Sequence, residues 1–264
     1  MKQAQYEDLA DKIAVVTGGL GNLGREICRE FSNQGISLVV LDKIDEDREF
    51  FDELREKRVS VDYFKVDFAE QIQRDSFFKI IQNNYKRIDI IVNNAAFVGT
   101  SDLPGWSVDF KDQSLRTWTE AIEVNLTTPF HLIQCLETNL RESENPVIIN
   151  LGSIYGTHGP DWELYRGTQM GNPAAYAASK GGVIQLTRWL ATTLAPKIRV
   201  NCVSPGGIFR GQDNDFVTKY NAKNPLGRMA TEFEIVAAIV FLCSESSSYI
   251  TGQNFHIDGG WSAW

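Results

Sequence analysis

Short apolar runs recur along the chain at regular intervals and predict seven β-strands. Several runs, such as Leu38 to Leu41, are apolar at every position, which is typical of strands buried on both faces of a parallel sheet. The predicted strands are Ile13–Thr17, Ser37–Leu41, Val59–Val66, Ile88–Val92, Val147–Leu151, Ile198–Val203 and Asn254–Ile257.

Segments with helical spacing separate these strands. Leu23–Gln34 carries apolar residues four positions apart, and Asp45–Arg58 begins with acidic and ends with basic residues, as a helix dipole favours. The alternation predicts an α/β fold, with one doubly wound, Rossmann-like parallel sheet and helices on both faces. The sequence shows no linker or repeat, so we expect residues 1–264 to form one domain that begins with a short N-terminal extension (1–11).

Two long stretches break this alternation, each directly after a predicted strand. Gly152–Pro173 is rich in Gly, Pro and aromatic residues, and Ser204–Pro225 is rich in Gly, Asn and Asp. Loops of this length are uncommon and often functional, and open α/β sheets bind ligands at the carboxyl ends of their strands. We therefore expect a ligand site there, with residues 204–225 as a candidate substrate lid.

Composition and charge exclude several classes of protein. The net charge of −8 disfavours general binding of nucleic acid. The four cysteines form no CxxC pair and indicate reduced thiols in a cytoplasmic protein, and the three scattered histidines give no sign of a metal site. No segment reaches the roughly 20 apolar residues that cross a bilayer, and the first dozen residues do not resemble a signal peptide. We expect neither membrane nor nucleic acid as a partner.

A glycine-rich turn, Gly18–Gly24, joins the first strand to the first helix. In this context small residues let the backbone approach a pyrophosphate, and the helix N-terminus supplies N–H donors. Asp42 ends the second strand, 18 residues after Gly24, where a carboxylate accepts the ribose hydroxyls and repels a 2′-phosphate. The pattern favours NAD over NADP, and the adjacent Lys43 softens that preference. The alternative for Asp42 is a helix N-cap.

These and later motifs, taken in order, resemble the short-chain dehydrogenase/reductase family along nearly the whole chain. The matching segments are Thr17–Gly24, Asp67, Asn93–Ala96, Asn125, Ser153, the Tyr176…Lys180 pair, Pro205-Gly206, Pro225–Arg228 and Thr251–Gly260. The resemblance implies hydride transfer between a nicotinamide cofactor and a secondary alcohol or carbonyl. It also implies a catalytic set of Asn125, Ser153, Tyr176 and Lys180. The implied cofactor-binding residues are Gly18, Asn22, Leu23, Gly24, Asp42, Lys43, Asp67, Phe68, Asn94, Ala95, Tyr176, Lys180, Pro205, Gly206 and Ile208.

The chemistry explains why these residue types are needed. Removal of hydride from an alcohol carbon needs a base at oxygen, and a free tyrosine, with a pKa of about 10, is mostly protonated at neutral pH. Tyr176 and Lys180 share a helix face, so we expect the ammonium and an oxidised nicotinamide to lower the pKa of the phenol. Ser153 would hydrogen-bond the substrate oxygen. Pro129 predicts a kink near Asn125, whose alternative role is a cap or kink filler.

The chain departs from the family pattern at four places. Asn22 stands where the short form has Gly, and we expect it to tolerate a left-handed backbone. The same glycine spacing resembles the extended, sugar-nucleotide-modifying branch. Ala96 replaces a motif Gly, and 23 residues separate Ser153 from Tyr176, a longer gap than usual. Arg210 replaces a Thr that contacts the cofactor, so Arg210 is assigned to the pyrophosphate, the substrate or solvent.

The loops predicted to overhang the site suggest the substrate class. They bring Trp106, Tyr155, Trp162, Tyr165 and Arg210, which suit either stacking on a sugar ring or a subunit contact. We take Ser153, Tyr155, Tyr165, Tyr176 and Arg210 as substrate-binding residues and a sugar, polyol or sugar derivative as the substrate. The loop also resembles oxidoreductases of bacterial surface-sugar and flagellin modification. The alternatives are an epimerase or dehydratase with bound NAD, and a non-catalytic dinucleotide sensor.

The family's paired long helices imply a homodimer or homotetramer. The matching segments are Thr117–Leu140 and Ala174–Leu194. The apolar tail Trp261–Trp264 docks either on a neighbouring subunit or on its own core.

Overall fold

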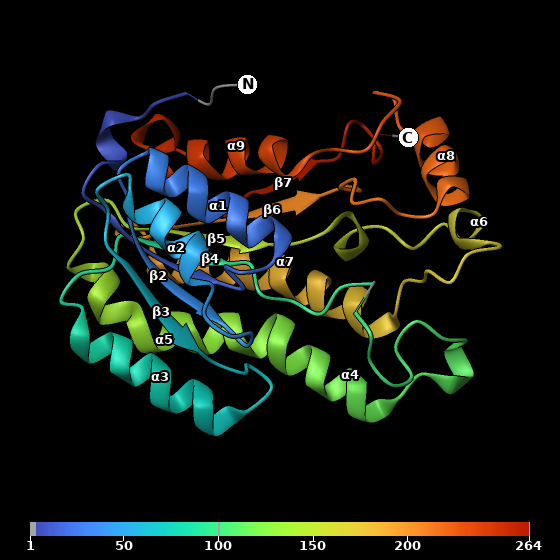
Figure 1. Ribbon diagram of the computed structural model, residues 1–264, viewed down its shortest axis with the longest axis horizontal. Helices are drawn as coiled ribbons and strands as arrows, with labels where there is room; N and C mark the ends of the chain where they lie inside the picture. Colours follow the sequence, from blue (N-terminus) through green and yellow to red (C-terminus); the bar gives the residue numbers. More distant parts are fainter. Residues whose placement is uncertain (1–3, 100, 264) are drawn as a thin grey trace.

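A single parallel sheet organises the chain, for which the computed structural model describes residues 4–99 and 101–263. The strand order is β3-β2-β1-β4-β5-β6-β7, and every pair is parallel (Figure 1). This confirms the doubly wound α/β prediction. The strands are β1 (Ile13–Thr17), β2 (Ser37–Asp42), β3 (Val61–Lys65), β4 (Ile90–Asn93), β5 (Val147–Leu151), β6 (Arg199–Pro205) and β7 (Asn254–Ile257).

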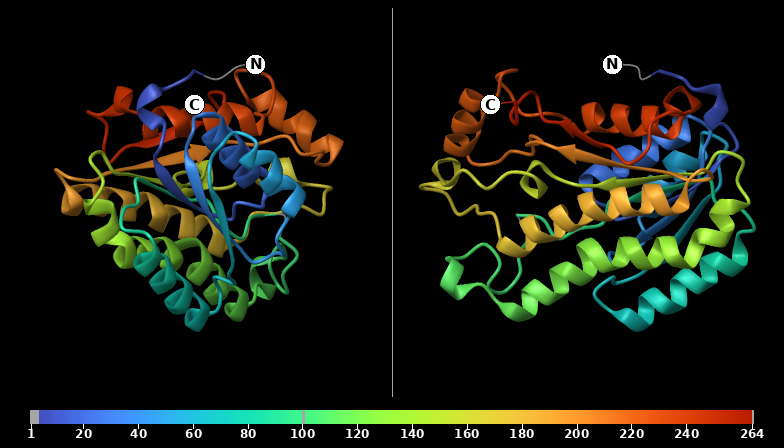
Figure 2. Two further views of the ribbon diagram at one scale, coloured as in Figure 1. Left: turned by 60° about the vertical axis from the view of Figure 1, so that its left-hand side comes forward. Right: turned by 180° about the vertical axis from the view of Figure 1, so that it is seen from behind.

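Helices cover both faces of the sheet (Figure 2). One face packs against α1 (Asn22–Asn33), α2 (Arg48–Arg55) and α9 (Glu232–Cys243). The other packs against α3 (Gln71–Asn84), α4 (Leu115–Ile122), α5 (Thr128–Arg141) and α7 (Ala174–Leu194). Because the central strands are buried on both sides, their apolar side chains at successive positions feed two separate cores, which explains their continuous apolar runs.

Two further helices lie beyond the carboxyl ends of the strands. These are α6 (Trp162–Tyr165) in the long segment after β5 and α8 (Asn214–Lys223) in the segment after β6. They lie side by side at one end of the molecule (Figure 1), and Tyr165 stacks on Phe216 with ring centroids 5.4 Å apart. The two long segments that interrupt the alternation of strands and helices therefore pack against each other.

Several predicted boundaries differ from those observed. The helix expected at Asp45–Arg58 is α2, Arg48–Arg55, because Asp47 caps it by accepting the Phe50 N–H. The helix expected at Thr117–Leu140 is broken by a π-helical turn, Glu123–Thr127, which confirms the kink predicted near Asn125.

The N-terminal segment from residue 4 onward packs against the domain. Leu9 is fully buried, and Gln34 holds this segment by accepting from the Tyr6 N–H and donating to the Ala4 carbonyl. Among the described residues, no helix is both long enough and apolar enough to cross a membrane.

The turn between β1 and α1 requires glycine at position 24. A Cβ on Gly24 would lie 2.0 Å from the Gly18 carbonyl oxygen, so the helix can approach the turn only without a side chain. By contrast, a Cβ on Gly159 would meet nothing within 4 Å.

We therefore predict that Gly24→Ala lowers the free energy of unfolding by more than about 2 kcal/mol through this clash. Gly159→Ala, the matched control, should change it by less than about 1 kcal/mol. Chemical denaturation of both variants measures this, and equal effects would contradict the close approach.

Candidate active site

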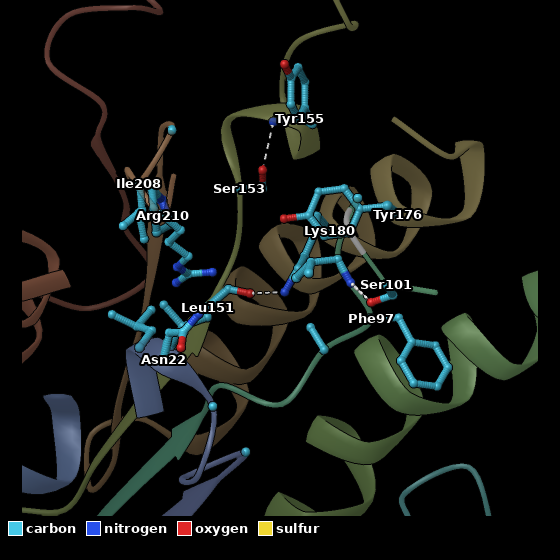
Figure 3. Close-up of a pocket in the computed structure, with 18 of the residues that line it drawn as sticks. Asn22, Phe97, Ser101, Leu151, Ser153, Tyr155, Tyr176, Lys180, Ile208 and Arg210 are labelled. Atoms are coloured by element: carbon cyan, nitrogen blue, oxygen red, sulfur yellow. Dashed lines mark hydrogen bonds between the residues drawn. The ribbon is translucent and has the colours of Figure 1, made fainter. Parts of the chain in front are cut away.

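A cavity of about 910 Å³ opens at the carboxyl ends of the strands. It runs from the glycine turn at the start of α1, past the ends of β4 and β5, to the segments that contain α6 and α8. Figure 3 shows side chains from these separate elements converging on it. The topology brings them together because all strands are parallel and end at the same edge.

The glycine turn forms one end of this cavity. Gly18 has a left-handed backbone, with φ of +66°, and the Asn94 carboxamide donates to the carbonyl oxygens of Thr17 and Gly18 at 3.1 and 2.9 Å. Asn22 is the first residue of α1 and is helical, so the expectation of a left-handed Asn22 was wrong. Gly18 supplies the turn instead, and the helix N-terminus faces the cavity as an anion site requires.

Asp42 lies at the end of β2 beside this turn and is 8% exposed. Its carboxylate accepts the Leu20 N–H at 2.9 Å and the Lys43 N–H at 2.7 Å. It lines the cavity and caps no helix, since Asp47 caps α2, so the N-cap alternative was wrong. The Lys43 ammonium lies 5.2 Å from the centroid of the Phe97 ring.

All of the residues predicted to bind the cofactor line this one cavity. They are Gly18, Asn22, Leu23, Gly24, Asp42, Lys43, Asp67, Phe68, Asn94, Ala95, Tyr176, Lys180, Pro205, Gly206 and Ile208. The glycine turn leaves room for a pyrophosphate, and the Asp42 carboxylate beside it can accept from ribose hydroxyls, so the two together fit a dinucleotide. Among the described residues, no cluster of three or more His, Cys, Asp or Glu side chains could hold a metal ion.

Ser153, Tyr176 and Lys180 meet in the middle of the cavity (Figure 3). Ser153 follows β5, and its hydroxyl accepts the Tyr155 N–H at 3.2 Å. Tyr176 and Lys180 come from the first turns of α7, and the Lys180 ammonium lies 5.8 Å from the Tyr176 ring centroid. The hydroxyl and the phenol come close enough for Ser153 to lower the pKa of Tyr176.

The Lys180 ammonium is buried with a single hydrogen-bond acceptor. It is 3% exposed and donates to the Leu151 carbonyl at 2.6 Å. Burial lowers the pKa of Lys180 to about 8. Two donor positions of the ammonium therefore have no acceptor among the described residues.

The pKa of Tyr176 in the protein without cofactor is set mainly by desolvation. Burial raises the pKa of the phenol, and the Ser153 hydroxyl and the Arg210 charge counteract this only in part. The expected lowering depends on an oxidised nicotinamide as well as on Lys180 and stays a prediction. The phenol is therefore neutral at physiological pH in this structure, the form that can donate a proton.

Asn125 lies in the π-helical turn and is 1% exposed, outside the cavity lining. Its carboxamide accepts the Phe97 N–H at 2.7 Å and donates to the Phe97 carbonyl and to the Ser179 hydroxyl. It thus ties the segment after β4 to α7, which carries Tyr176 and Lys180. The π-helical turn gives it the position from which it reaches both.

The far end of the cavity is formed by the two long segments. Tyr155, Tyr165 and Arg210 line it, as predicted, and the Tyr165 hydroxyl donates to the Tyr155 hydroxyl at 2.7 Å. An ion pair between Asp161 and Lys223 joins the segment containing α6 to α8. Arg210 pairs with Glu232 at 2.8 Å while its charge still reaches Tyr176.

The structure also corrects and extends the predicted set. Trp106 is 2% exposed and donates its indole N–H to the Val98 carbonyl, and Trp162 lies outside the lining, so neither overhangs the site as expected. Asn172 does line the cavity and was missed. No sequence signal distinguished it from the other polar residues in this segment, because its orientation depends on how the segment packs.

The architecture and site define a dinucleotide-dependent oxidoreductase, and comparison with known proteins agrees. The profile of the Enoyl-(Acyl carrier protein) reductase family matches residues 19–262. The acetoacetyl-CoA reductase of Acinetobacter sp. is 32% identical, over 94% of this chain and 97% of that protein.

Two solved structures are also similar over nearly their whole length. A short-chain dehydrogenase from Leptospira borgpetersenii with bound NAD+ is 33% identical with a TM-score of 0.83, covering 96% of this chain and 93% of that one. A putative NAD(P)-dependent gluconate 5-dehydrogenase from Beutenbergia cavernae with bound NADP is 28% identical with a TM-score of 0.85, covering 97% and 99%. The chain belongs to the short-chain dehydrogenase/reductase family. It is an NAD(P)-dependent oxidoreductase that acts on carbonyl or CH–OH groups.

The buried ammonium predicts a pH-dependent stability. The pKa of Lys180 is about 8 in the folded protein, against 10.5 for an exposed lysine, so the unfolded chain binds more protons between these pH values. Stability should therefore rise with pH in that window. Lys180→Met removes the cost of the buried charge and the bond to Leu151, so it should stabilise the apoprotein by about 2 kcal/mol at pH 7.

This difference should shrink toward zero as the pH approaches 10.5. Urea denaturation across that range measures it, with Lys57→Met, at an exposed position, as the control. A difference in stability between Lys180→Met and wild type that does not change with pH would contradict the proposal that it arises from the buried Lys180 charge.

Proposed function

We propose that the protein interconverts a secondary alcohol and a ketone on a sugar, polyol or sugar derivative, with NAD as the hydride carrier. The observation that carries this proposal is the convergence of Ser153, Tyr176 and Lys180 within one cavity that also contains the glycine turn. We assign Tyr176 as the general acid and base, Ser153 as the hydrogen-bond donor to the substrate oxygen, and Lys180 as the cation beside them. Asn125 is a positioning residue.

The proton steps follow from the chain's own groups. In reduction the neutral Tyr176 phenol donates a proton to the substrate oxygen, which Ser153 holds in place. In oxidation Tyr176 takes the hydroxyl proton, and the Lys180 ammonium and Arg210 charge stabilise the phenolate that forms. When bound, the nicotinamide accepts or delivers the hydride at the substrate carbon. Burial of Tyr176 and Lys180 strengthens these interactions by excluding water.

A hydroxylated substrate is supported by the lining of the cavity beyond the glycine turn. Beside the apolar side chains of Met170, Phe216 and Met229, this lining carries hydroxyl, amide and charged groups from Ser101, Ser153, Tyr155, Tyr165, Asn172, Tyr176, Arg210 and Gln212. An acyl chain would leave many of these groups without partners, at a cost in binding energy. One similar structure is named as a gluconate 5-dehydrogenase, whereas the acetoacetyl-CoA reductase is named for a thioester. The polar groups of the lining favour a hydroxylated substrate over a thioester.

The preference for NAD rests on Asp42. Its carboxylate lines the cavity beside the glycine turn, where it would repel a 2′-phosphate and accept from ribose hydroxyls. The Lys43 ammonium lies over the Phe97 ring instead of pairing with this carboxylate. The negative charge of Asp42 is thus not neutralised by its neighbour.

We also propose a homodimer or homotetramer built on α4, α5 and α7. These helices expose Trp118, Phe130 and Trp189, at 38%, 40% and 54%. The Trp261 ring packs edge-on against Tyr155 of its own chain, which supports the intramolecular alternative for this residue, and Trp264 lies outside the described residues. All four cysteines are free, and the cytoplasmic location stays a prediction.

Replacement of the catalytic phenol tests the proposed reaction. Tyr176→Phe should lower kcat about 10²- to 10⁴-fold because it removes the proton donor and acceptor while keeping the ring. Turnover is measured as net NADH formation with a panel of sugars and polyols. Tyr249→Phe, at a fully exposed tyrosine, is the matched control and should retain activity.

Unchanged turnover in Tyr176→Phe would sink the catalytic assignment. Conversion of a sugar with no net NADH would instead support the epimerase or dehydratase alternative.

The cofactor preference is tested at Asp42. Asp42→Asn keeps an acceptor for the Leu20 N–H but removes the charge, so the ratio of kcat/KM with NADP to that with NAD should rise about 10- to 100-fold. Asp45→Asn, which removes an exposed charge nearby, is the control and should leave the ratio unchanged. Wild-type preference for NADP would contradict the assignment.

A further inference from the structure

One polar side chain in the cavity is buried and poorly paired. Asn172 is 6% exposed, directly precedes the proline that opens α7, and lines the cavity. Neither atom of its carboxamide makes a hydrogen bond of normal geometry to a described residue, although the carboxamide lies close enough to the Tyr165 hydroxyl to lower the pKa of that phenol. Leaving both atoms unpaired is unfavourable, and such groups in folded proteins indicate a partner that binds.

The surroundings of Asn172 place it beside the tyrosine pair. Burial raises the pKa of Tyr165 to about 12, and the Asn172 carboxamide and Tyr155 hydroxyl lower it in part, so both lie close to the Tyr165 hydroxyl. The Tyr165 hydroxyl donates to Tyr155, whose own proton has no acceptor within residues 4–99 and 101–263. Three hydrogen-bonding groups therefore lie together: the amide oxygen, which has no donor among the described residues, the amide N–H beside the Tyr165 hydroxyl, and the Tyr155 proton.

This cluster lies in the same cavity as the reacting groups, beyond them from the glycine turn. Tyr155 follows Ser153 by two residues, and its N–H is bonded to the Ser153 hydroxyl, while its own hydroxyl points away from Ser153 and Tyr176 (Figure 3). A substrate whose oxygen is held between Ser153 and Tyr176 would reach Asn172 with a part that extends past the reacting carbon.

The donor and acceptor pattern selects among the chemical groups that could lie there. A hydroxyl both donates and accepts, so it can satisfy the carboxamide oxygen and accept from the amide or phenol. A carbonyl or thioester oxygen only accepts and would leave the Asn172 oxygen buried and unpaired. An alkyl group would leave both amide atoms unpaired.

We propose that Asn172, together with the Tyr155–Tyr165 pair, forms a subsite for a hydroxyl group on a substrate carbon beyond the reacting one. The substrate is then a polyol or a polyhydroxylated ketone. This inference rests on the proposed function and deepens it, because it assigns a residue that selects hydroxylated rings over acyl thioesters.

Matched substrate pairs test the subsite directly. Cyclohexane-1,2-diol and cyclohexane-1,4-diol are compared with cyclohexanol, and D-glucose and D-galactose with their 2-, 3- and 6-deoxy forms, each with the NAD-loaded enzyme. Wild type should show a kcat/KM ratio, hydroxylated over deoxy, of about 10 to 100 for at least one pair. Asn172→Leu should bring that ratio down to about 1, because it keeps the volume and removes both polar atoms.

Two further variants separate recognition from a merely structural effect. Asn221→Leu removes another carboxamide whose oxygen is unpartnered, but from α8 and outside the cavity lining, and should leave the ratio as in wild type. Asn172→Asp keeps the side-chain shape and an acceptor, so it provides a folded variant if Asn172→Leu does not fold. It should lower the ratio about tenfold by loss of the donor.

The outcomes distinguish failure of the subsite from failure of the proposed function. The subsite is overturned, and the proposed function stands, in either of two cases. In the first, wild type turns over the substrate pairs with a kcat/KM ratio of about 1. In the second, Asn172→Leu or Asn172→Asp keeps a high ratio. Reduction of acetoacetyl-CoA with no turnover of any hydroxylated probe, or turnover of no probe at all, overturns the proposed substrate class and the subsite with it.

Discussion

The active site depends on a sheet whose strands are all parallel and buried on both faces. Such a sheet has no solvated face on which to build a site, and each connection must return across a helix before the next strand begins. The carboxyl ends of β1 to β6 therefore meet at one edge, where the segments that follow these six strands all contribute to one cavity. The apolar core fixes the position of this edge, and the polar side chains of the site lie outside the core.

Polar groups near that edge are held with fewer partners than usual. Among the described residues, Lys180 has one acceptor and the Asn172 carboxamide makes no hydrogen bond of normal geometry, and burial raises the pKa of Tyr176. Each arrangement is costly in the protein alone. Because these groups make few hydrogen bonds within the protein, few bonds must break before they interact with a bound molecule.

The two ends of the cavity are built in different ways. At the dinucleotide end, backbone groups and small residues determine the geometry, so few alternatives to Gly18 and Gly24 exist. At the far end, side chains of the segment after β5 meet those of α8, through Tyr165 on Phe216 and Asp161 with Lys223. The first arrangement depends on backbone conformation, while the second depends on the identity of individual side chains.

The sequence by itself determined the succession of strands and helices, the α/β class and the residues of the glycine turn, because these depend on local periodicity and on backbone conformations that few residues allow. Ser153, Tyr176 and Lys180 were predicted from the family resemblance, because the spacing of Tyr176 and Lys180 by itself occurs often by chance. The tertiary structure alone decided which aromatic residues face the cavity: Trp106 lies in the core and Tyr155 in the site. It also decided the desolvation that raises the pKa of Tyr176 and the exposure of Asn172 to the cavity. These properties depend on desolvation and on contacts between segments far apart in the sequence, which no local pattern encodes.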